Sequence, residues 1–200
     1  MMRLGYRVVI VPALVLATLG MTAFRADRVD GQSAVAKRPA AGLKLTAVLS
    51  EHRLDVTRGD SLLGTYDISI GKDEHPTPNG TFKIKKLIWN PRWVPPDAEW
   101  AKNKTAKAPG DKLNPMKVVK IFFKEPDYYI HGTADLNSLG GRASHGCLRM
   151  NPTEAAEVAR WIMAHGGAPR PENWFLRVLH SRREEKVVYL RTPVSLTITK

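Results

Sequence analysis

No disulfide bond can form within this chain, because its 200 residues include a single cysteine, Cys147. Apolar residues make up 43% of the sequence, which is ample for the packed core of one domain. The start of the chain carries an export pattern, and exported proteins normally use their cysteines in pairs. A lone thiol in such a chain is either a small buried hydrophobe or a nucleophile, and its neighbours must decide between the two.

Residues 1–24 have the pattern of a signal peptide or an N-terminal membrane anchor. Arg3 and Arg7 form a positive flank, and Val8–Phe24 is a stretch of seventeen residues without a charge. This length is at the short limit for crossing a bilayer, so a cleaved signal and a retained anchor both stay open. A poor cleavage site around residues 21–23 favours the anchor. Either reading places the protein at the cell envelope, in the periplasm or on the outer face of the inner membrane.

Residues 25–42 are rich in Arg, Asp, Ala, Gly and Pro without apolar periodicity, and predict a linker. The folded domain is therefore expected over residues 43–200. The formal net charge of +12 would attract the chain to anionic envelope polymers or lipid headgroups. No nucleic-acid-binding motif with interleaved aromatic residues is present, so nucleic acid is not an expected partner.

The fold class follows from short runs of alternating apolar residues separated by turns, which predict a mostly β (α+β) domain. The expected strands are residues 45–49, 53–57, 62–70, 81–87, 118–123, 128–131 and 192–199. Only one helix is well signalled, and it follows Cys147. Asn151 can cap it, Pro152 suits its first position, Glu154 completes a capping-box pattern, and Gly166 ends it.

Two segments stand apart from this pattern. Residues 89–117 hold Trp89, Trp93 and Trp100 among several prolines. This segment is either a binding loop or lid, or an insertion whose tryptophans fold onto the core. Residues 167–191 form an extension before the last strand, for which an added helix and a second cover over the site are both open.

Two histidines are candidate bases for Cys147. A free thiol is only partly ionised near neutral pH, so a nucleophilic cysteine benefits from a neighbouring base. If residues 144–147 are extended, His145 points to the same side as the sulfur, but its ring is held parallel to the thiol. His131 arrives from a separate strand and can approach from across the site. We therefore favour His131 as the general base and His145 as a neighbouring support.

Other residues of the same segment have predicted roles. Gly146, which lacks a Cβ, lets substrate come close, and its amide and that of Cys147 can donate to an oxyanion. Arg149 shares the face of Cys147 and can hold a substrate carboxylate, with a surface ion pair as the alternative. Ser144 is predicted to contact substrate as well. A zinc site is disfavoured, because no Cys-x-x-Cys or His-x-x-x-His spacing supports it.

The stretches Ile130-His131-Gly132 and Ser144-His145-Gly146-Cys147-Leu148-Arg149-Met150-Asn151 together resemble the signature of the L,D-transpeptidase catalytic domain of the YkuD type. Residues 50–54 resemble the early hairpin of that family, and residues 77–82 resemble its T-P-x-G-x-F turn. Residues 90–93 and 114–116 resemble its loop segments. The likeness covers residues 43 to about 166. It favours a nucleophile at Cys147 over a buried hydrophobe.

The resemblance implies a β-sandwich or barrel, no metal and no organic cofactor. It also implies that Cys147 attacks the carbonyl between the third and fourth residues of a peptidoglycan stem peptide. His131 would be the base, oriented by the backbone carbonyl of Gly132. Terminal D-alanine leaves, and an amine of a neighbouring stem resolves the thioester. Resolution by water (a carboxypeptidase) or by a wall-attached protein stays open. A non-catalytic wall-binding module and a cysteine peptidase of another fold are disfavoured.

Overall fold

The computed structural model describes residues 42–200, so the predicted export segment and nearly all of the predicted linker lie outside the described residues. Within residues 42–200, no helix combines the length and the apolar character needed to cross a membrane. The strands are β1 (Leu43–Val48), β2 (Arg53–Arg58), β3 (Ser61–Asp67), β4 (Ile70–Gly71), β5 (Gly80–Trp89), β6 (Lys117–Lys124), β7 (Tyr128–Gly132), β8 (Arg142–Ser144), β9 (Leu148–Met150) and β10 (Lys186–Thr199). The α-helices are α1 (Pro152–His165) and α2 (Glu172–Ser181), and the short 3-10 helices are η1 (Leu49–Glu51), η2 (Glu99–Ala101) and η3 (Leu136–Ser138).

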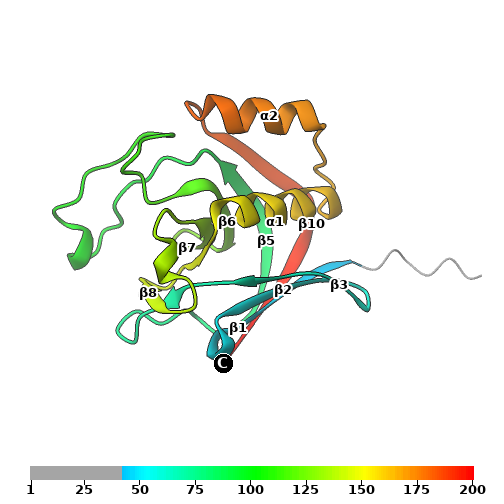
Figure 1. Cartoon of the computed structure of the whole chain (residues 1–200), viewed down its shortest axis with the longest axis horizontal. Helices are drawn as coiled ribbons and strands as arrows, with labels where there is room; N and C mark the ends of the chain where they lie inside the picture. The colour runs from blue at the N-terminus through cyan, green and yellow to red at the C-terminus, as the bar shows by residue number, and fades with distance from the viewer. Residues whose placement is uncertain (1–41) are drawn as a thin grey trace, which may run out of the picture. The chain divides into compact units, whose positions relative to one another are not determined.

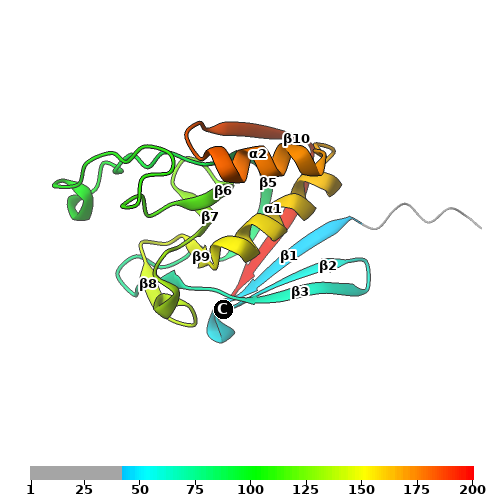
Figure 2. The ribbon, with the colours of Figure 1, turned by 45° about the horizontal axis from the view of Figure 1, so that its top comes forward.

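Eight of the strands form one mixed sheet in the order β3-β2-β1-β10-β5-β6-β7-β9. Two pairs in it are parallel, β1 with β10 and β7 with β9, and the other neighbours are antiparallel. The strands β4 and β8 form a separate parallel pair. Figures 1 and 2 show β10 crossing the domain between the β1–β3 hairpin strands and β5. The prediction of a mostly β fold is therefore confirmed.

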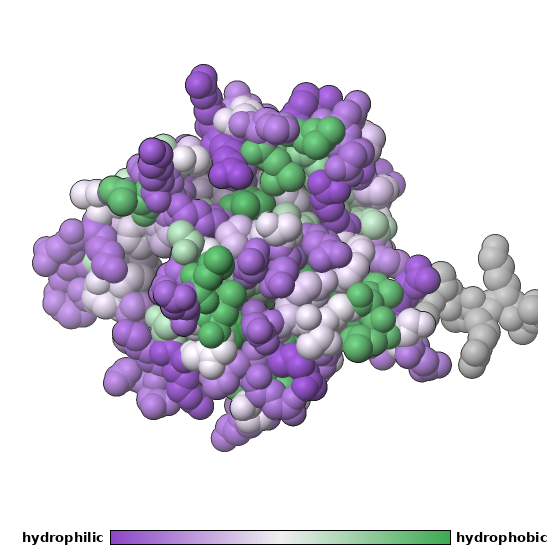
Figure 3. Space-filling view, viewed as in Figure 1, coloured by the Kyte–Doolittle hydropathy of each residue, from purple (hydrophilic) through white to green (hydrophobic). Residues whose placement is uncertain are grey.

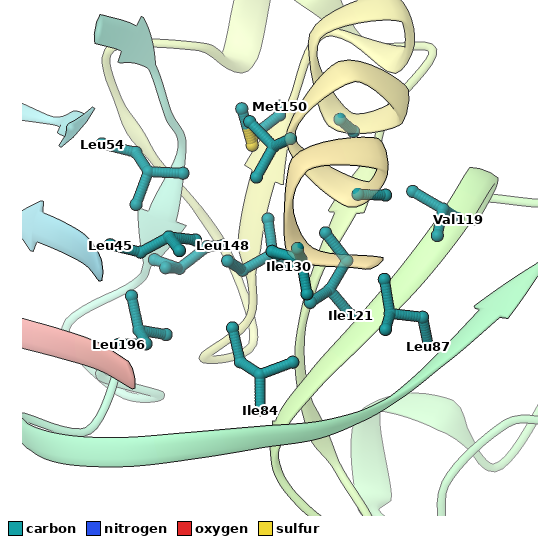
Figure 4. Packing of buried hydrophobic residues seen from close by; sticks show 14 of the residues in the cluster. Leu45, Leu54, Ile84, Leu87, Val119, Ile121, Ile130, Leu148, Met150 and Leu196 are labelled. Atoms are coloured by element: carbon teal, nitrogen blue, oxygen red, sulfur yellow. The ribbon is translucent and has the colours of Figure 1, made fainter. Parts of the chain in front are cut away.

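The core lies inside the curve of this sheet. In β2, Leu54 and Val56 are fully buried, while the residues that alternate with them are partly exposed, as a half-buried strand requires. Figure 4 shows Leu54 and its neighbours Leu45 and Leu196 facing Ile130 and other residues of the opposite strands across the core. Burial of these side chains, rather than a covalent link, stabilises the domain.

Helix α1 closes the core along β6 and β7, as Figure 1 shows. Its start is as predicted, because the side chain of Asn151 accepts a hydrogen bond from the amide of Thr153 (2.9 Å) and Pro152 occupies the first turn. The helix buries one apolar stripe, which consists of Ala155, Val158, Ala159, Ile162 and Met163. The position directly after the β9 strand is therefore fixed by a well-capped helix.

The extension over residues 167–191 contains a second helix, α2, which is one of the two alternatives that the sequence left open. Its buried residues Phe175 and Val178 face inward, and the ring of Phe175 lies 5.5 Å from that of Trp89. Two apolar residues at this spacing also fit a loop, which is why the sequence left the helix open. The last strand begins at Lys186 rather than at Thr192, because residues 186–189 pair with β5.

We expect Leu196→Ala to lower the free energy of unfolding by about 2–5 kcal/mol, because this fully buried β10 side chain would leave a cavity. Chemical denaturation measures the loss. Leu62→Ala is the matched control, because Leu62 is 61% exposed on β3 and its truncation should change stability by less than about 0.5 kcal/mol. Equal losses in the two variants would contradict this description of the core.

Candidate active site

One face of the sheet is not covered by α1 and forms the floor of a cleft of about 1120 Å³. Strand register places one row of side chains across this face, because directly opposed residues point to the same side. The row runs from Val187 on β10 through Ile88, Lys120 and His131 to Arg149 on β9. The predicted base and the predicted carboxylate-binding arginine are thus next to each other.

A second row runs parallel to the first, from Tyr189 through Lys86 and Phe122 to Tyr129. Three of its members are in contact. The ammonium of Lys86 lies 4.3 Å from the centre of the Phe122 ring, and the rings of Phe122 and Tyr129 are 5.4 Å apart. This row leads to the thiol, because hydrogen bonding from Tyr129 lowers the pKa of Cys147.

Cys147 lies between β8 and β9, where the chain bends instead of continuing as a strand. The bend is centred on Gly146, which has a φ of 103°. A Cβ at this glycine would lie 2.7 Å from the ring of Tyr128, so the position requires glycine for backbone and packing reasons. The expected reason was close approach of substrate, and the structure supplies a different one. The thiol is partly exposed to the cleft and donates to the carbonyl oxygen of Asp127 (3.3 Å).

His131 is 3% exposed at the end of β7. Its Nδ1 lies 2.9 Å from the carbonyl oxygen of Gly132, the contact that the resemblance implies. A carbonyl can only accept, so Nδ1 carries the proton and Nε2 is left with a free lone pair. The backbone therefore selects the tautomer that a general base needs.

Burial keeps both groups neutral at rest. Loss of hydration lowers the pKa of His131 to about 3 against the opposing effect of the Gly132 carbonyl, and Arg149 and Lys120 lower it further. Loss of hydration also raises the pKa of the Cys147 thiol to about 11, although Tyr129, Lys120 and Arg149 act in the opposite direction. Near pH 7 the site therefore holds a thiol and a neutral imidazole, rather than a thiolate and an imidazolium.

The ring of His145 packs against the long loop over residues 89–117. Its ring stacks on that of Trp100 at 3.8 Å and 12°, and lies 4.8 Å from the ring of His75. Burial lowers the pKa of His145, and the neighbouring His75 adds to this. Both predictions for the loop hold in part: Trp89 belongs to the core, whereas Trp93 and Trp100 line the cleft.

Two groups that were predicted to contact substrate form hydrogen bonds within the protein. The buried hydroxyl of Ser144 donates to the carbonyl of Cys147 (2.6 Å) and accepts from the amide of Gly146 (3.0 Å). Ser144 therefore braces the turn, and the amide of Gly146 is already engaged. In this structure both groups are therefore engaged by hydrogen bonds within the turn. The amide of Cys147 stays the candidate oxyanion donor.

Lys120 is a residue that the sequence analysis missed. Its ammonium lies 4.8 Å from the centre of the Tyr129 ring and 3.2 Å from the carbonyl oxygen of Arg92. Burial lowers its pKa, although Glu185 and Cys147 oppose this. Within the described residues, neither Lys120 nor Arg149 forms a salt bridge. These two cations beside the thiol are therefore available to anions. An isolated lysine in a strand gives no signal in sequence.

A sequence model of the YkuD family, described as the L,D-transpeptidase catalytic domain, matches residues 44–195. The chain belongs to this family. Its resemblance to the L,D-transpeptidase catalytic domain and its fold class are thereby confirmed. L,D-transpeptidase 1 of Mycobacterium tuberculosis is 30% identical over 112 residues, which cover 55% of this chain and 43% of that protein.

Solved L,D-transpeptidases share the fold. One from Mycobacterium smegmatis superposes with a TM-score of 0.50 at 18% identity, over 80% of this chain and 59% of that one. L,D-transpeptidase 3 from Mycobacterium tuberculosis gives a TM-score of 0.52 at 15% identity, over 80% and 62%. The chain thus spans less than two thirds of the length of these proteins. Within residues 42–200, no group of three His, Cys, Asp or Glu side chains could hold a metal ion.

We expect Gly146→Ala to destabilise this L,D-transpeptidase domain more than Gly140→Ala does. Both glycines have positive φ, which costs about 1–3 kcal/mol for a residue with a side chain. A Cβ at Gly140 meets open space, whereas one at Gly146 meets the ring of Tyr128. Thermal and urea denaturation of the two variants separate backbone strain from the clash. Equal losses would contradict the packing reason given for Gly146.

We also expect His131 to make the domain less stable in acid. An unfolded histidine titrates near 6.5, whereas folded His131 has a pKa of about 3. Between these values the unfolded chain binds a proton that the folded protein does not, so stability falls as the pH drops below about 6.5. The slope of the free energy of unfolding against pH includes up to about 1.4 kcal/mol per pH unit from this histidine. Urea denaturation from pH 7 to pH 4.5 should show a shallower loss in His131→Gln; parallel curves would contradict the depressed pKa.

Proposed function

We propose that the chain is a peptidoglycan L,D-transpeptidase in which Cys147 is the nucleophile and His131 the general base. One observation carries this proposal. His131, with its Nδ1 fixed on Gly132, lies on β7 directly beside the β9 strand that Cys147 precedes, and both residues line one cleft. Membership of the family supports the same reaction class, and stem peptides are the proposed substrate.

Acylation begins when the thiol turns from the Asp127 carbonyl to Nε2 of His131. The imidazole takes the proton as the sulfur bonds to the carbonyl carbon between the third and fourth residues of the stem. The C–N bond then breaks, and the leaving amine of D-alanine takes the proton from Nε2. Because both groups are neutral at rest, proton transfer accompanies attack instead of preceding it.

Lys120 and Arg149 are proposed to bind anionic parts of the stem and to favour the thiolate. Both cations lower the pKa of Cys147, so they stabilise negative charge as it develops on the sulfur. The stem peptide carries carboxylates, which a half-buried guanidinium can hold through two parallel hydrogen bonds. The amide of Cys147 would receive the oxyanion, since that of Gly146 is engaged by Ser144.

Deacylation uses the same residues in reverse. An amine of a neighbouring stem enters the cleft, gives a proton to Nε2 of His131, and attacks the thioester carbonyl. The C–S bond breaks, the sulfur recovers its proton, and a cross-link is left behind. Water or a wall-attached protein in place of the amine would give the alternative products. We place this reaction at the cell envelope, on the basis of the uncharged segment in residues 8–24.

Cys147→Ala should abolish release of D-alanine from tetrapeptide muropeptides while leaving the denaturation curve unchanged. His131→Ala should lower the acylation rate by about 10²–10⁴-fold, because it removes a general base. His145→Ala should have a smaller effect, since its ring packs on Trp100. Stopped-flow or quenched assays of D-alanine release measure all three. Small and equal effects at the two histidines would contradict the assignment of the base.

Mass spectrometry of the products decides the acceptor. Incubation of the purified protein with tetrapeptide muropeptides should give a thioester on Cys147, a D-alanine loss and a cross-linked dimer. Tripeptide alone would identify hydrolysis as the outcome. Failure to form any thioester with intact, folded protein would overturn the proposed function.

A further inference from the structure

The open face of the sheet continues well beyond the reacting groups, onto the first half of β10. There Val187 is 49% exposed and Tyr189 is 70% exposed. Residues 186–189 pair with β5 on one side, while the pairing of β10 with β1 is confined to residues 195–199. A large aromatic and an aliphatic side chain thus stand side by side on a solvent-facing surface, where packing does not require them.

This surface is continuous with the cleft. The lining of the cleft extends to Ile88 and Glu185, and Ile88 is the cross-strand partner of Val187. The view in Figure 3 shows a mostly hydrophilic molecule with separate hydrophobic patches, one of them in the region of α2. The exposed residues of β10 differ from isolated surface hydrophobes, because they end two rows of side chains. One row contains His131 and the other ends at Tyr129, which lies beside the thiol.

The length of these rows matches the substrate. Tyr129, beside the thiol, is three strand steps from Tyr189, or about 15 Å at about 4.8 Å per step. Three extended stem residues before the attacked carbonyl span about 10 Å. The sugar that carries the stem follows directly after them. A donor stem lying along the row would therefore bring its saccharide over the β5–β10 edge.

We propose that Tyr189 and Val187 form a saccharide-binding subsite for the glycan that carries the donor stem. This inference rests on the proposed function, since that supplies the stem. The apolar C–H face of a pyranose ring packs on an aromatic ring, which is the interaction that an exposed tyrosine on a flat sheet offers. Val187 enlarges the apolar surface. The hydroxyl of Tyr189, which is 70% exposed, can hydrogen-bond to a ligand at the edge of this surface.

Ion pairs beside the subsite supply polar partners for the hydroxyl and acetamido groups of such a sugar. Lys86, the cross-strand partner of Tyr189, is paired with Glu125. Arg92 is paired with Glu185, just before β10, at 3.2 Å. These pairs are partly exposed and flank the apolar residues. An apolar platform with polar groups at its rim is the general form of a small-ligand site.

The test compares two donors, a free tetrapeptide and the same tetrapeptide on its disaccharide. Wild-type protein should release D-alanine from the disaccharide-tetrapeptide with a kcat/KM about tenfold higher, equivalent to about 1.4 kcal/mol of extra binding. Tyr189→Ser should remove this preference while leaving the rate on the free tetrapeptide unchanged. Tyr189→Phe should keep it, because the ring is retained. Leu62→Ser is the matched control, an exposed hydrophobe on β3 that should change neither rate.

Equilibrium binding to Cys147→Ala protein makes the result independent of turnover. In that background Tyr189→Ser should weaken the disaccharide-tetrapeptide about tenfold and leave the free tetrapeptide unchanged. A preference that survives Tyr189→Ser, or equal losses on both ligands, would overturn the subsite. Tyr189-dependent saccharide binding without any D-alanine release would instead overturn the proposed function and leave the subsite standing.

Discussion

The parallel pairing of β7 with β9 is the interaction on which the site depends. It joins two segments that are separated by η3 and the β8 strand, and it sets His131 opposite Arg149. The inward face of the same pair is held by Ile130 and Leu148, which are fully buried in the core. A slip of one residue in this register would turn His131 into the core and Ile130 into the cleft. The hydrophobic effect therefore fixes the position of His131, the proposed base.

The two faces of the sheet have different tasks. The inner face is filled by branched aliphatic side chains and covered by α1, so it is rigid and dry. The outer face borders the cleft and carries cations, aromatic rings and the proposed base His131 in two ordered rows. Because alternate residues of one strand serve both faces, the core and the cleft are built by the same segments, and the proposed saccharide subsite on β10 follows from the same alternation.

The neutral state of the reacting pair has a physical cause and a consequence. Removing water from Cys147 and His131 penalises their charged forms more than the neighbouring cations favour the thiolate. A neutral thiol is less reactive than a thiolate toward solvent oxidants, and Cys147 has no partner thiol in the chain.

The sequence by itself determined most strands of the large sheet, the capped helix α1, and the short list that contains Cys147 and His131, because alternation, capping and local motifs depend on neighbours along the chain. It did not determine β8, β9 or the first half of β10. It did not show that Ser144 is engaged within its own turn, that residues 172–181 form α2, or that Lys120 lies beside His131. These depend on contacts between distant segments: Ser144 is enclosed by a turn, and Lys120 meets His131 only through strand register. Tertiary structure alone decides which polar groups form hydrogen bonds inside the protein and which stay available to a ligand.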